Sequence, residues 1–416
     1  MLNAQINEVF DINKGSGNSG PTNFIVFDGK LYFSADDISG ENTGGEDKGR
    51  ELWVTDGTAG GTNLVKDIRV GSSNGSPFAF FIFNNKLYFS ANDGTGSDLW
   101  TTDGTDAGTT KIDLFPGVTE AVQRAIELDG KVYMTGISTT GDTNDLIVWD
   151  GTTATNANTT ANDESILSTM AVLNGKLLMY ASYEPDDATV DNELYEFDPT
   201  TGVFKLIKDI DPGTQNSSIS NLTTLGSKVY FEADNELWET DGTEAGTIKV
   251  LKAEEAGVNN VTNFYAWDNK MFFEGDDGTG DQLWVYNPSA NSVSKISNIS
   301  GTNNNHDPSD YVAYDGYLYY KGEDANDTSS HLFRTNGTTV EQLDNTITDV
   351  DDLVLFNDKI YFEGDNGTTG RELFSINLST LSIDNIFNAS VSVFPNPSAD
   401  FIKVNVDFNV VVIFSI

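Results

Sequence analysis

Short apolar runs recur along most of the chain, and each follows a turn. The first run reads GKLYF, and its tyrosine is Tyr32. Short runs of β-branched and aromatic residues that are bounded by turn residues predict strands. Seven further copies follow, at Tyr88, Tyr133, Leu178, Tyr230, Phe272, Tyr319 and Tyr361. The chain therefore repeats one strand-bearing unit eight times, at intervals of 42 to 56 residues.

Each unit contains four such runs, separated by turn residues. In the first unit they read NFIVF, KLYFSA, ELWVT and LVKDI, within residues 23–68. Asp-Gly and Asn-Gly pairs supply the positive φ angles that tight turns need. The pattern predicts an all-β fold made of four-stranded antiparallel sheets.

The strands of the first unit are apolar on both faces. We expect Tyr32 and Trp53 on one side of the sheet, and the other side is expected to carry Leu31, Phe33, Leu52 and Val54. A sheet with two apolar faces needs neighbours on both sides. A closed ring gives every sheet two neighbours. The sequence thus predicts a β-propeller of about eight four-stranded blades, with seven blades as the alternative.

The start of the chain indicates how such a ring closes. Residues 8–27 align without a gap with residues 64–83, at the offset of 56 that separates Tyr32 from Tyr88. The chain therefore begins on a fourth strand, and a terminal strand that completes the last blade removes the open seam. The last unit has its own candidate fourth strand, LSIDNIF (residues 381–387). Either residues 8–12 displace that strand, or they are the remnant of a longer array.

Composition narrows the possible partners. The chain has 23 Lys plus Arg against 64 Asp plus Glu, a net charge of −41, which repels nucleic-acid backbones and anionic lipid surfaces. We therefore expect no nucleic acid as a partner. The same carboxylates suit calcium, whose ligands are oxygen atoms. Cysteine is absent, so the chain forms no disulfide and no thiolate metal site. No apolar run is long enough to span a bilayer as a helix, and we expect no membrane insertion.

The repeated phrase resembles a known family. The segments ELWVTDGTAGGTNLVKDI (residues 51–68) and FNNKLYFSANDGTGSDLWTTDGTDAGTTKI (residues 83–112) are similar to the ELWxxDGT repeat family of secreted proteins, many of them from the Bacteroidetes and some hyalin-like. The resemblance covers about residues 8–388 and is strongest in units one, two and five. It implies a β-propeller-like fold and an extracellular or cell-surface location, and it implies no established reaction.

The C-terminal segment carries a second resemblance. VSVFPNPSADFIKVNV (residues 391–406) is similar to the opening of the type A sorting domain of the type IX secretion system. It implies the start of a small β-sandwich-like sorting segment over residues 389–416 and the type IX secretion machinery as a partner, and it leaves residues 1–388 to the propeller. Members of that family continue for several more strands, and the first residues here lack the pattern of a secretory signal. The alternative is a Pro-Asn-Pro turn before a single strand.

Loops between the second and third strands are rich in carboxylates and glycine. Their oxygen atoms are suited to wrap a calcium ion. None has the helix-flanked pattern of the common calcium loop, and Asp-Gly is also the usual way to turn a strand, so plain hairpin loops are the alternative. The candidate calcium ligands are Asp36, Asp37, Asp93, Asp276, Asp277 and Asp365.

Other repeated residues favour a structural role. The Asp of each TDGT phrase is typical of a turn residue that bonds its own backbone, as expected for Asp56, Asp103 and Asp241. The tryptophans at the ELW position recur at one place in each blade, which favours packing between blades over a sugar-stacking platform. They are Trp53, Trp100, Trp238 and Trp284.

Catalysis is the less favoured interpretation. The two histidines, His306 and His331, fit no Ser/His/Asp order. A carboxylate pair for glycoside hydrolysis remains an alternative. Departures from the repeat cluster in units three and four, where residues 181–193 form the longest irregular acidic loop. An enzyme would gather carboxylates with a basic residue, such as Arg124 or Arg334, at the mouth of the central channel.

The sequence therefore predicts a secreted or cell-surface propeller that binds a glycan or a surface protein without catalysis and that acts as a monomer. One alternative is a secreted carbohydrate-active hydrolase or lyase with a carboxylate site at the channel. The other is a structural repeat unit of a surface filament.

Overall fold

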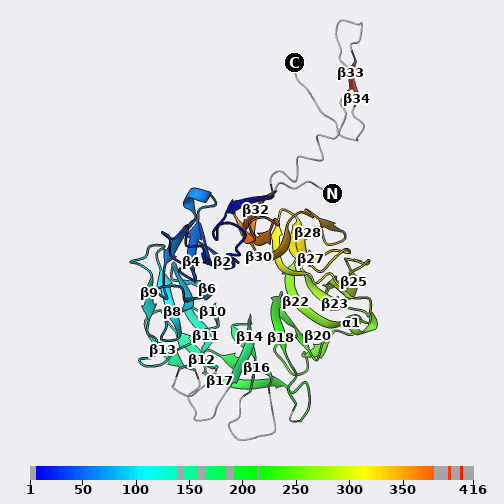
Figure 1. Cartoon of the computed structure of the whole chain (residues 1–416). Coiled ribbons are helices and arrows are strands. Elements are labelled where there is room, and N and C mark those ends of the chain that lie inside the picture. The colour runs from blue at the N-terminus through cyan, green and yellow to red at the C-terminus, as the bar shows by residue number, and fades with distance from the viewer. Residues whose placement is uncertain are drawn as a thin grey trace.

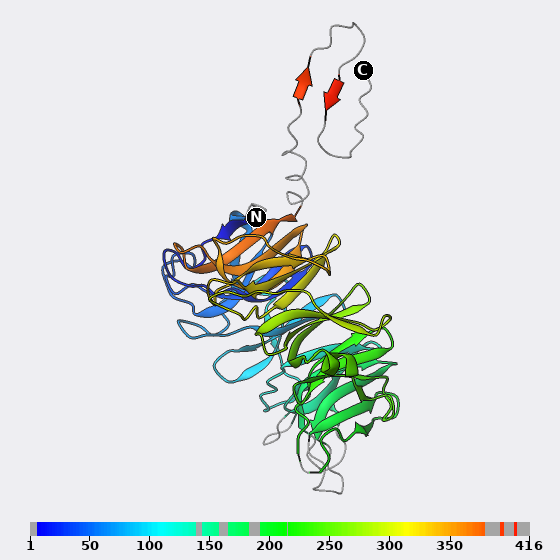
Figure 2. The ribbon, with the colours of Figure 1, turned by 90° about the vertical axis from the view of Figure 1, so that its right-hand side faces the viewer.

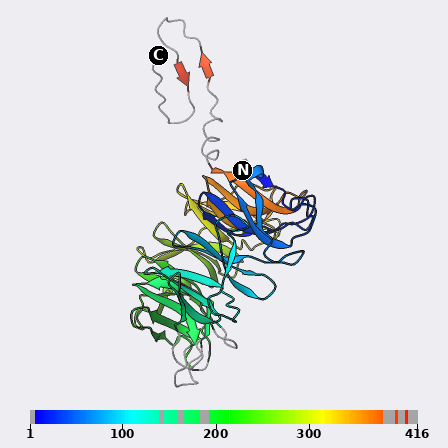
Figure 3. The same ribbon diagram turned by 90° about the vertical axis from the view of Figure 1, so that its left-hand side faces the viewer.

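Eight four-stranded antiparallel sheets stand in a ring, as Figure 1 shows face-on and Figures 2 and 3 show from two sides. The structure is a computed structural model that describes residues 6–138, 144–157, 165–182, 192–213 and 215–378, together with 392–394 and 403–405. We number the blades 1 to 8 around the ring and name their strands A to D from the ring axis outward. The prediction of eight blades is confirmed, and the alternative of seven is wrong.

Seven blades take their strands in chain order. Blade 1 consists of β2 (Thr22–Phe27), β3 (Lys30–Asp36), β4 (Arg50–Thr55) and β5 (Asn63–Lys66), and blade 2 of β6 (Phe78–Phe83), β7 (Lys86–Asn92), β8 (Ser97–Thr102) and β9 (Thr110–Ile112). Blade 3 consists of β10 (Arg124–Leu128), β11 (Lys131–Gly136), β12 (Asp145–Trp149) and β13 (Ala154–Asn156), and blade 4 of β14 (Ser165–Leu173), β15 (Lys176–Ser182), β16 (Glu193–Asp198) and β17 (Val203–Lys208). Blade 5 consists of β18 (Ser220–Leu225), β19 (Lys228–Ala233), β20 (Glu236–Thr240) and β21 (Ile248–Lys249), and blade 6 of β22 (Asn259–Trp267), β23 (Lys270–Asp276), β24 (Asp281–Asn287) and β25 (Ser292–Lys295). Blade 7 consists of β26 (Ser309–Tyr314), β27 (Tyr317–Glu323), β28 (Ser330–Thr335) and β29 (Val340–Gln342).

Blade 8 is built from strands of both the N-terminal and the C-terminal part of the propeller sequence. Its strands A to C are β30 (Thr348–Phe356), β31 (Lys359–Asp365) and β32 (Arg371–Asn377), and its strand D is β1 (Ile6–Phe10). Outside the blades lie η1 (Ala59–Gly61), α1 (Leu251–Glu255) and the antiparallel pair of β33 (Ser392–Phe394) and β34 (Lys403–Asn405). Among the described residues, no helix is both long and apolar enough to cross a membrane.

The N-terminal strand closes the ring. In the antiparallel pairing of β1 with β32, Ile6 lies opposite Ile376 and Asn7 lies opposite Ser375. The inner strands β2 and β30 are in contact across the same seam. Of the two alternatives for residues 8–12, the structure supports the one in which this part of the chain supplies the fourth strand of the last blade. The other candidate, LSIDNIF at 381–387, lies outside the described residues.

Two-residue turns join strands A and B in all eight blades. In seven of them both residues have positive φ, as in Asp28 at 46° and Gly29 at 69°. This conformation matches the type I′ turn, whose twist suits a hairpin, and it explains why Asp, Asn and Gly fill these positions.

The DGT turns between strands C and D are held by their aspartates. Oδ1 of Asp56 accepts hydrogen bonds from the N–H of Thr58 at 2.9 Å and from its hydroxyl at 2.7 Å. The same bonds recur at Asp103 and Asp241. The structural interpretation of these three aspartates is confirmed.

The apolar core lies between blades. One face of blade 1 packs on blade 2, with Tyr32, Leu52 and Val54 against Leu87 and Phe89. Its other face packs on blade 8, with Leu31, Phe33 and Trp53 against Tyr361 and Leu373. Both faces of the sheet are therefore buried, as its sequence pattern predicts.

The predicted faces of Leu52, Trp53 and Val54, all on β4, are wrong. In the register of β3 and β4, Tyr32 lies opposite Val54, and Phe33 lies opposite Trp53. Residues that are opposite in a ladder point to the same face, so Trp53 shares a face with Phe33. A one-residue difference in pairing exchanges the two faces, and the long loop at 37–49 hides the correct pairing from the sequence.

The repeated tryptophans pack between blades, as predicted. Trp53, Trp100 and Trp284 are 1%, 6% and 4% exposed. Trp238 is half-buried, and the ammonium of Lys249 lies 5.9 Å from the centre of its ring. Buried rings offer no open platform on which a sugar could stack.

Ile12 provides a test of ring closure, because it is fully buried in the cluster that joins blades 8 and 1. We expect Ile12→Ala to lower the free energy of unfolding by about 2–5 kcal/mol, since it leaves a cavity at the seam. Val70→Ala is the matched control at a site that is 86% exposed, and it should change stability by less than about 0.5 kcal/mol. Urea unfolding followed by tryptophan fluorescence measures both, and equal effects would contradict this role of Ile12.

Candidate functional site

The propeller has two open ends along its ring axis, and they differ in the regularity of the loops that they carry. One end carries the uniform A–B turns and the C–D turns. The other carries the B–C loops and the D–A linkers, because strand B ends where strand A begins in an antiparallel sheet. The B–C loops range in length from 234–235 in blade 5 to 37–49 in blade 1. We name the B–C loops and D–A linkers together the variable rim.

A buried glutamate fastens the first linker of this rim to its blade. Glu51 begins the ELW phrase and is fully buried. Its carboxylate accepts the N–H groups of Ile68, Arg69 and Gly75 at 2.9, 3.1 and 2.9 Å. Burial raises the pKa of Glu51 to about 7. The repeated Glu of the phrase is the sequence signal for this role, which was not among the predictions.

Glu372 has the same role at the seam. It is fully buried, and burial raises its pKa to about 8. Its carboxylate accepts hydrogen bonds from the N–H groups of Ile12, Asn13 and Ser19, and from the Ser19 hydroxyl at 2.6 Å. The glutamate of blade 8 therefore holds the segment that follows β1.

Three carboxylates meet where the inner strands of blades 7 and 8 lie side by side. Asp310 on β26 and Asp351 on β30 both pair with the ammonium of Lys321, at 3.0 and 2.5 Å. Asp352 donates its N–H to the Asp310 carboxylate at 3.3 Å, and its own carboxylate accepts the N–H of Asn23 at 3.0 Å. These contacts link the inner strands of blades 7, 8 and 1. We name Asp310, Asp351 and Asp352 the inner cluster.

A repeated β-bulge positions this cluster. The ladders of β2, β26 and β30 shift register near Asn23, Asp310 and Asp352, where φ is 59°, 52° and 50°. Asn and Asp tolerate this left-handed conformation better than most residues. Burial, together with the neighbouring Asp351, raises the pKa of Asp310 to about 6. The cluster thus holds a carboxyl group whose pKa is raised toward neutrality.

A second acidic group lies on the variable rim between blades 6 and 7. We name Glu274, Asp281, Asp307 and Glu323 the rim patch. The first three offer oxygens within 4.8 Å of one another. Among the residues that the structure describes, no Lys or Arg forms an ion pair with these four carboxylates. Burial raises the pKa of Glu274 and of Glu323 to about 7. Carboxylates without a protein counter-charge attract cations.

The predicted calcium ligands are spread over blades 1, 2, 6 and 8. Asp37 accepts four hydrogen bonds from its own loop, and Asp277 bonds Thr279 and Lys295. Asp93 lies in a loop, whereas Asp36, Asp276 and Asp365 are the last residues of their B strands. Within the described ranges, none of the six belongs to a group of three ligand residues. Calcium at these loops stays a prediction, and the groups that the fold assembles consist of other residues.

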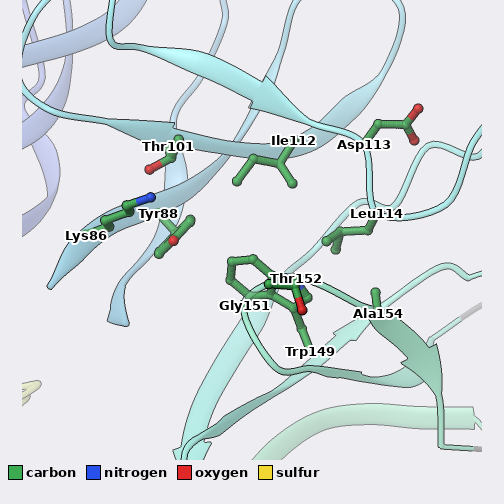
Figure 4. Close-up of a pocket in the computed structure, with 10 residues that line it drawn as sticks. All are labelled: Lys86, Tyr88, Thr101, Ile112, Asp113, Leu114, Trp149, Gly151, Thr152 and Ala154. Carbon is green, nitrogen blue, oxygen red and sulfur yellow. The ribbon is translucent and has the colours of Figure 1, made fainter. Parts of the chain in front are cut away.

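A pocket of about 320 Å³ lies between blades 2 and 3, at the end of the ring with the uniform turns. In Figure 4 the side chains of the two blades face one another across it, and Tyr88 meets Trp149 edge-on with their ring centres 5.0 Å apart. A pocket of about 370 Å³ occupies the corresponding place between blades 5 and 6. Because a similar gap occurs at a second interface between blades, we interpret both pockets as a consequence of how neighbouring blades pack.

The histidine and the arginines that were weighed in the enzymatic alternative do not contact the inner cluster. His306 is fully buried, with Nδ1 2.7 Å from the Glu323 carbonyl and Nε2 3.0 Å from the Tyr320 hydroxyl, and burial lowers its pKa to about 4. Arg334 donates to Glu341 at 2.9 Å on the outer strands of blade 7. Arg124 is exposed at the start of β10. The acidic loop at 181–193 lies mostly outside the described residues. Lys321 is the basic residue that the fold brings to carboxylates of the inner ring.

Comparison with known proteins supports the fold. No family model matches the chain, and no curated protein matches it. A puromycin hydrolase structure has a TM-score of 0.52 at 10% identity, over 86% of this chain and 61% of that one. The designed protein Ika8 has a TM-score of 0.51 at 13% identity, over 89% and 99%. The β-propeller domain of the Trilobed protease from Pyrococcus furiosus has a TM-score of 0.47 at 12% identity, over 79% and 99%. At such identities these likenesses concern the fold alone.

The buried glutamates generate a prediction about pH. Their pKa values are about 7 for Glu51 and about 8 for Glu372 in the folded protein, above the ordinary 4.5. Between about pH 4.5 and these raised pKa values, the folded state therefore binds more protons than the unfolded state. The corresponding stability is present below about pH 4.5 and is lost as the pH rises through about 7 to 8. We expect the melting temperature to fall between about pH 5 and 8.

Circular dichroism melts over this range test that prediction. Glu372→Gln should flatten the decline, whereas Glu244→Gln, on an exposed turn, should leave its slope unchanged. A melting temperature that rises with pH would contradict the role given to the buried glutamates.

Proposed function

We propose that this protein is a secreted or cell-surface binding propeller that recognises a glycan or protein ligand through its variable rim, without catalysis. The observation that carries the proposal is the difference between the two ends of the ring, with uniform A–B turns at one end and unequal loops at the other. Binding residues concentrate on loops that a rigid scaffold positions. The ELWxxDGT phrase and the sorting-like segment at 391–406 support an extracellular location and the type IX secretion machinery as a partner.

The rim patch indicates the kind of contact. Asn263 and Asn303 each donate to one of its carboxylates at 2.8 Å, so acceptors and donors stand side by side, as recognition of sugar hydroxyls requires. The net charge of −41 favours basic protein surfaces and disfavours anionic ones. We therefore expect the ligand to be a neutral glycan or a basic protein surface.

One observation favours the enzymatic alternative, a carbohydrate hydrolase or lyase. Asp310 has a pKa of about 6 and lies 3.0 Å from the ammonium of Lys321, and carboxyl groups with such shifts are candidates for acid–base catalysis. Glycoside hydrolysis needs two carboxyl groups that flank the bond. Release of reducing ends from polysaccharides by the wild type, and not by Asp310→Asn, would support this alternative.

A glycan and protein array tests the binding proposal. The double variant Glu274→Gln/Glu323→Gln neutralises two carboxylates of the rim patch, and we expect its array signal to fall at least tenfold, because each lost contact to a charged group weakens binding. The control Asp28→Asn/Asp315→Asn makes the same change in charge on exposed A–B turns and should bind as the wild type does. If the control loses binding equally, or if the rim variant binds normally, recognition does not depend on the rim patch.

A further inference from the structure

Blade 7 departs from the repeat at the position that fastens the linker. Blades 1 and 8 have Glu51 and Glu372 there, whereas blade 7 has His331. Its side chain is 4% exposed. Nδ1 of His331 lies 2.9 Å from the carbonyl oxygen of Ile347 in the following linker. An imidazole thus replaces a carboxylate at one point of the variable rim.

This contact fixes the position of the ring proton. A carbonyl oxygen only accepts, so Nδ1 of His331 donates and the neutral ring keeps a lone pair on Nε2. In the part of the chain that the structure describes, Nε2 makes no hydrogen bond, and Oδ2 of Asp324 faces it at 3.9 Å, beyond hydrogen-bond reach. Metal-binding histidines commonly donate their other ring N–H to a carbonyl or a carboxylate in this way. Nε2 of this largely buried side chain is therefore an available ligand atom.

Two aspartates lie around this nitrogen. Asp324, Asp327 and His331 each offer a ligand atom, and these atoms lie within 4.8 Å of one another. Oδ1 of Asp324 accepts the N–H groups of Asn326 and Asp327, at 2.7 and 3.4 Å. Its Oδ2 accepts the Asn326 amide at 3.1 Å and a longer bond from Gln342 at 3.5 Å. Asp324 is thus held in place beside the histidine, while Asp327 is exposed and gives solvent access to the group.

We propose that Asp324, Asp327 and His331 form a binding site for a divalent transition-metal ion, with Zn²⁺ as the best fit. One imidazole and two carboxylates suit zinc, whose bonds to them are about 2.0–2.2 Å, whereas calcium takes about six to eight oxygen ligands. Ligand atoms of a tetrahedral zinc ion are about 3.4 Å apart. Nε2 of His331 and Oδ2 of Asp324 are 3.9 Å apart, so these two ligand atoms would move slightly closer together on binding such an ion. Three protein ligands leave the fourth position open to water or to a group of a bound molecule.

The surrounding charges favour a cation. Glu323 of the rim patch directly precedes Asp324 in the chain. The amide of Asn303 donates hydrogen bonds to the Glu323 carboxylate at 2.8 Å and to the Asp327 carbonyl oxygen at 2.9 Å. Across the described ranges, no Lys or Arg pairs with Glu323, Asp324 or Asp327. A bound ion would supply the positive charge that neighbouring side chains do not.

Calorimetric titration of ZnCl₂ into the chelator-treated full chain tests the site. The wild type is expected to bind zinc, and His331→Gln should lower that affinity at least tenfold because it removes Nε2. Blade 6 has Gln282 at the same position, so the fold accommodates this substitution. Asp315→Asn, exposed on the A–B turn at the other end of blade 7, is the matched control and should leave zinc affinity unchanged.

NMR of histidine-labelled protein identifies the ligand directly, since the chain has two histidines. Zinc should shift the resonances of His331 and leave those of His306, whose two ring nitrogens are both hydrogen-bonded. Equal zinc affinity in His331→Gln would overturn the proposal. It would also be overturned if saturating zinc left the His331 resonances unchanged. Neither readout depends on the identity of the ligand in the proposed function.

Discussion

The burial of both faces of every blade is the constraint on which the rest of the structure depends. Blade 1 packs its Tyr32 face on blade 2 and its Trp53 face on blade 8, and no blade buries two apolar faces without two neighbours. A ring meets this demand for all eight blades, so the seam between blades 8 and 1 matters as much as any core. At that seam β1 completes the sheet, Ile12 fills the space between the blades, and Glu372 binds the chain between them.

The repeated phrase is explained almost entirely by this construction. The Asp of DGT closes a turn, the Trp of ELW packs between blades, and the Glu of ELW caps a linker through bonds that offset its burial. Positions that build the scaffold cannot easily vary, so recognition is expected where the phrase is interrupted. His331 in the Glu position and the carboxylates of the rim patch are such interruptions, and both lie on the variable rim.

Local patterns in the sequence predicted the strands, the turns and the eight blades, and they gave the place of residues 8–12 as one of two alternatives. They did not predict the face of Trp53, because a long loop leaves the register of two strands open by one residue. They also did not predict the inner cluster, since Asp310 and Asp351 come together only through a bulge in each of two neighbouring blades. The predicted calcium ligands were neighbours in sequence, whereas each group that the fold assembles combines strand residues with a linker, a loop or a second blade.

Closure by the N-terminal strand is the central claim of this account, and the absence of cysteine from the chain permits a direct measurement. Asn7→Cys and Ser375→Cys lie opposite each other on β1 and β32, where Cα atoms are about 4.5–5.5 Å apart. A disulfide needs about 4.4–6.8 Å. Oxidation of the native double variant should form the bond, detected by mass spectrometry. Asn7→Cys with Asn377→Cys, two residues out of register, should not form it. No bond in the first pair, or an equal yield in the second, would contradict closure by β1.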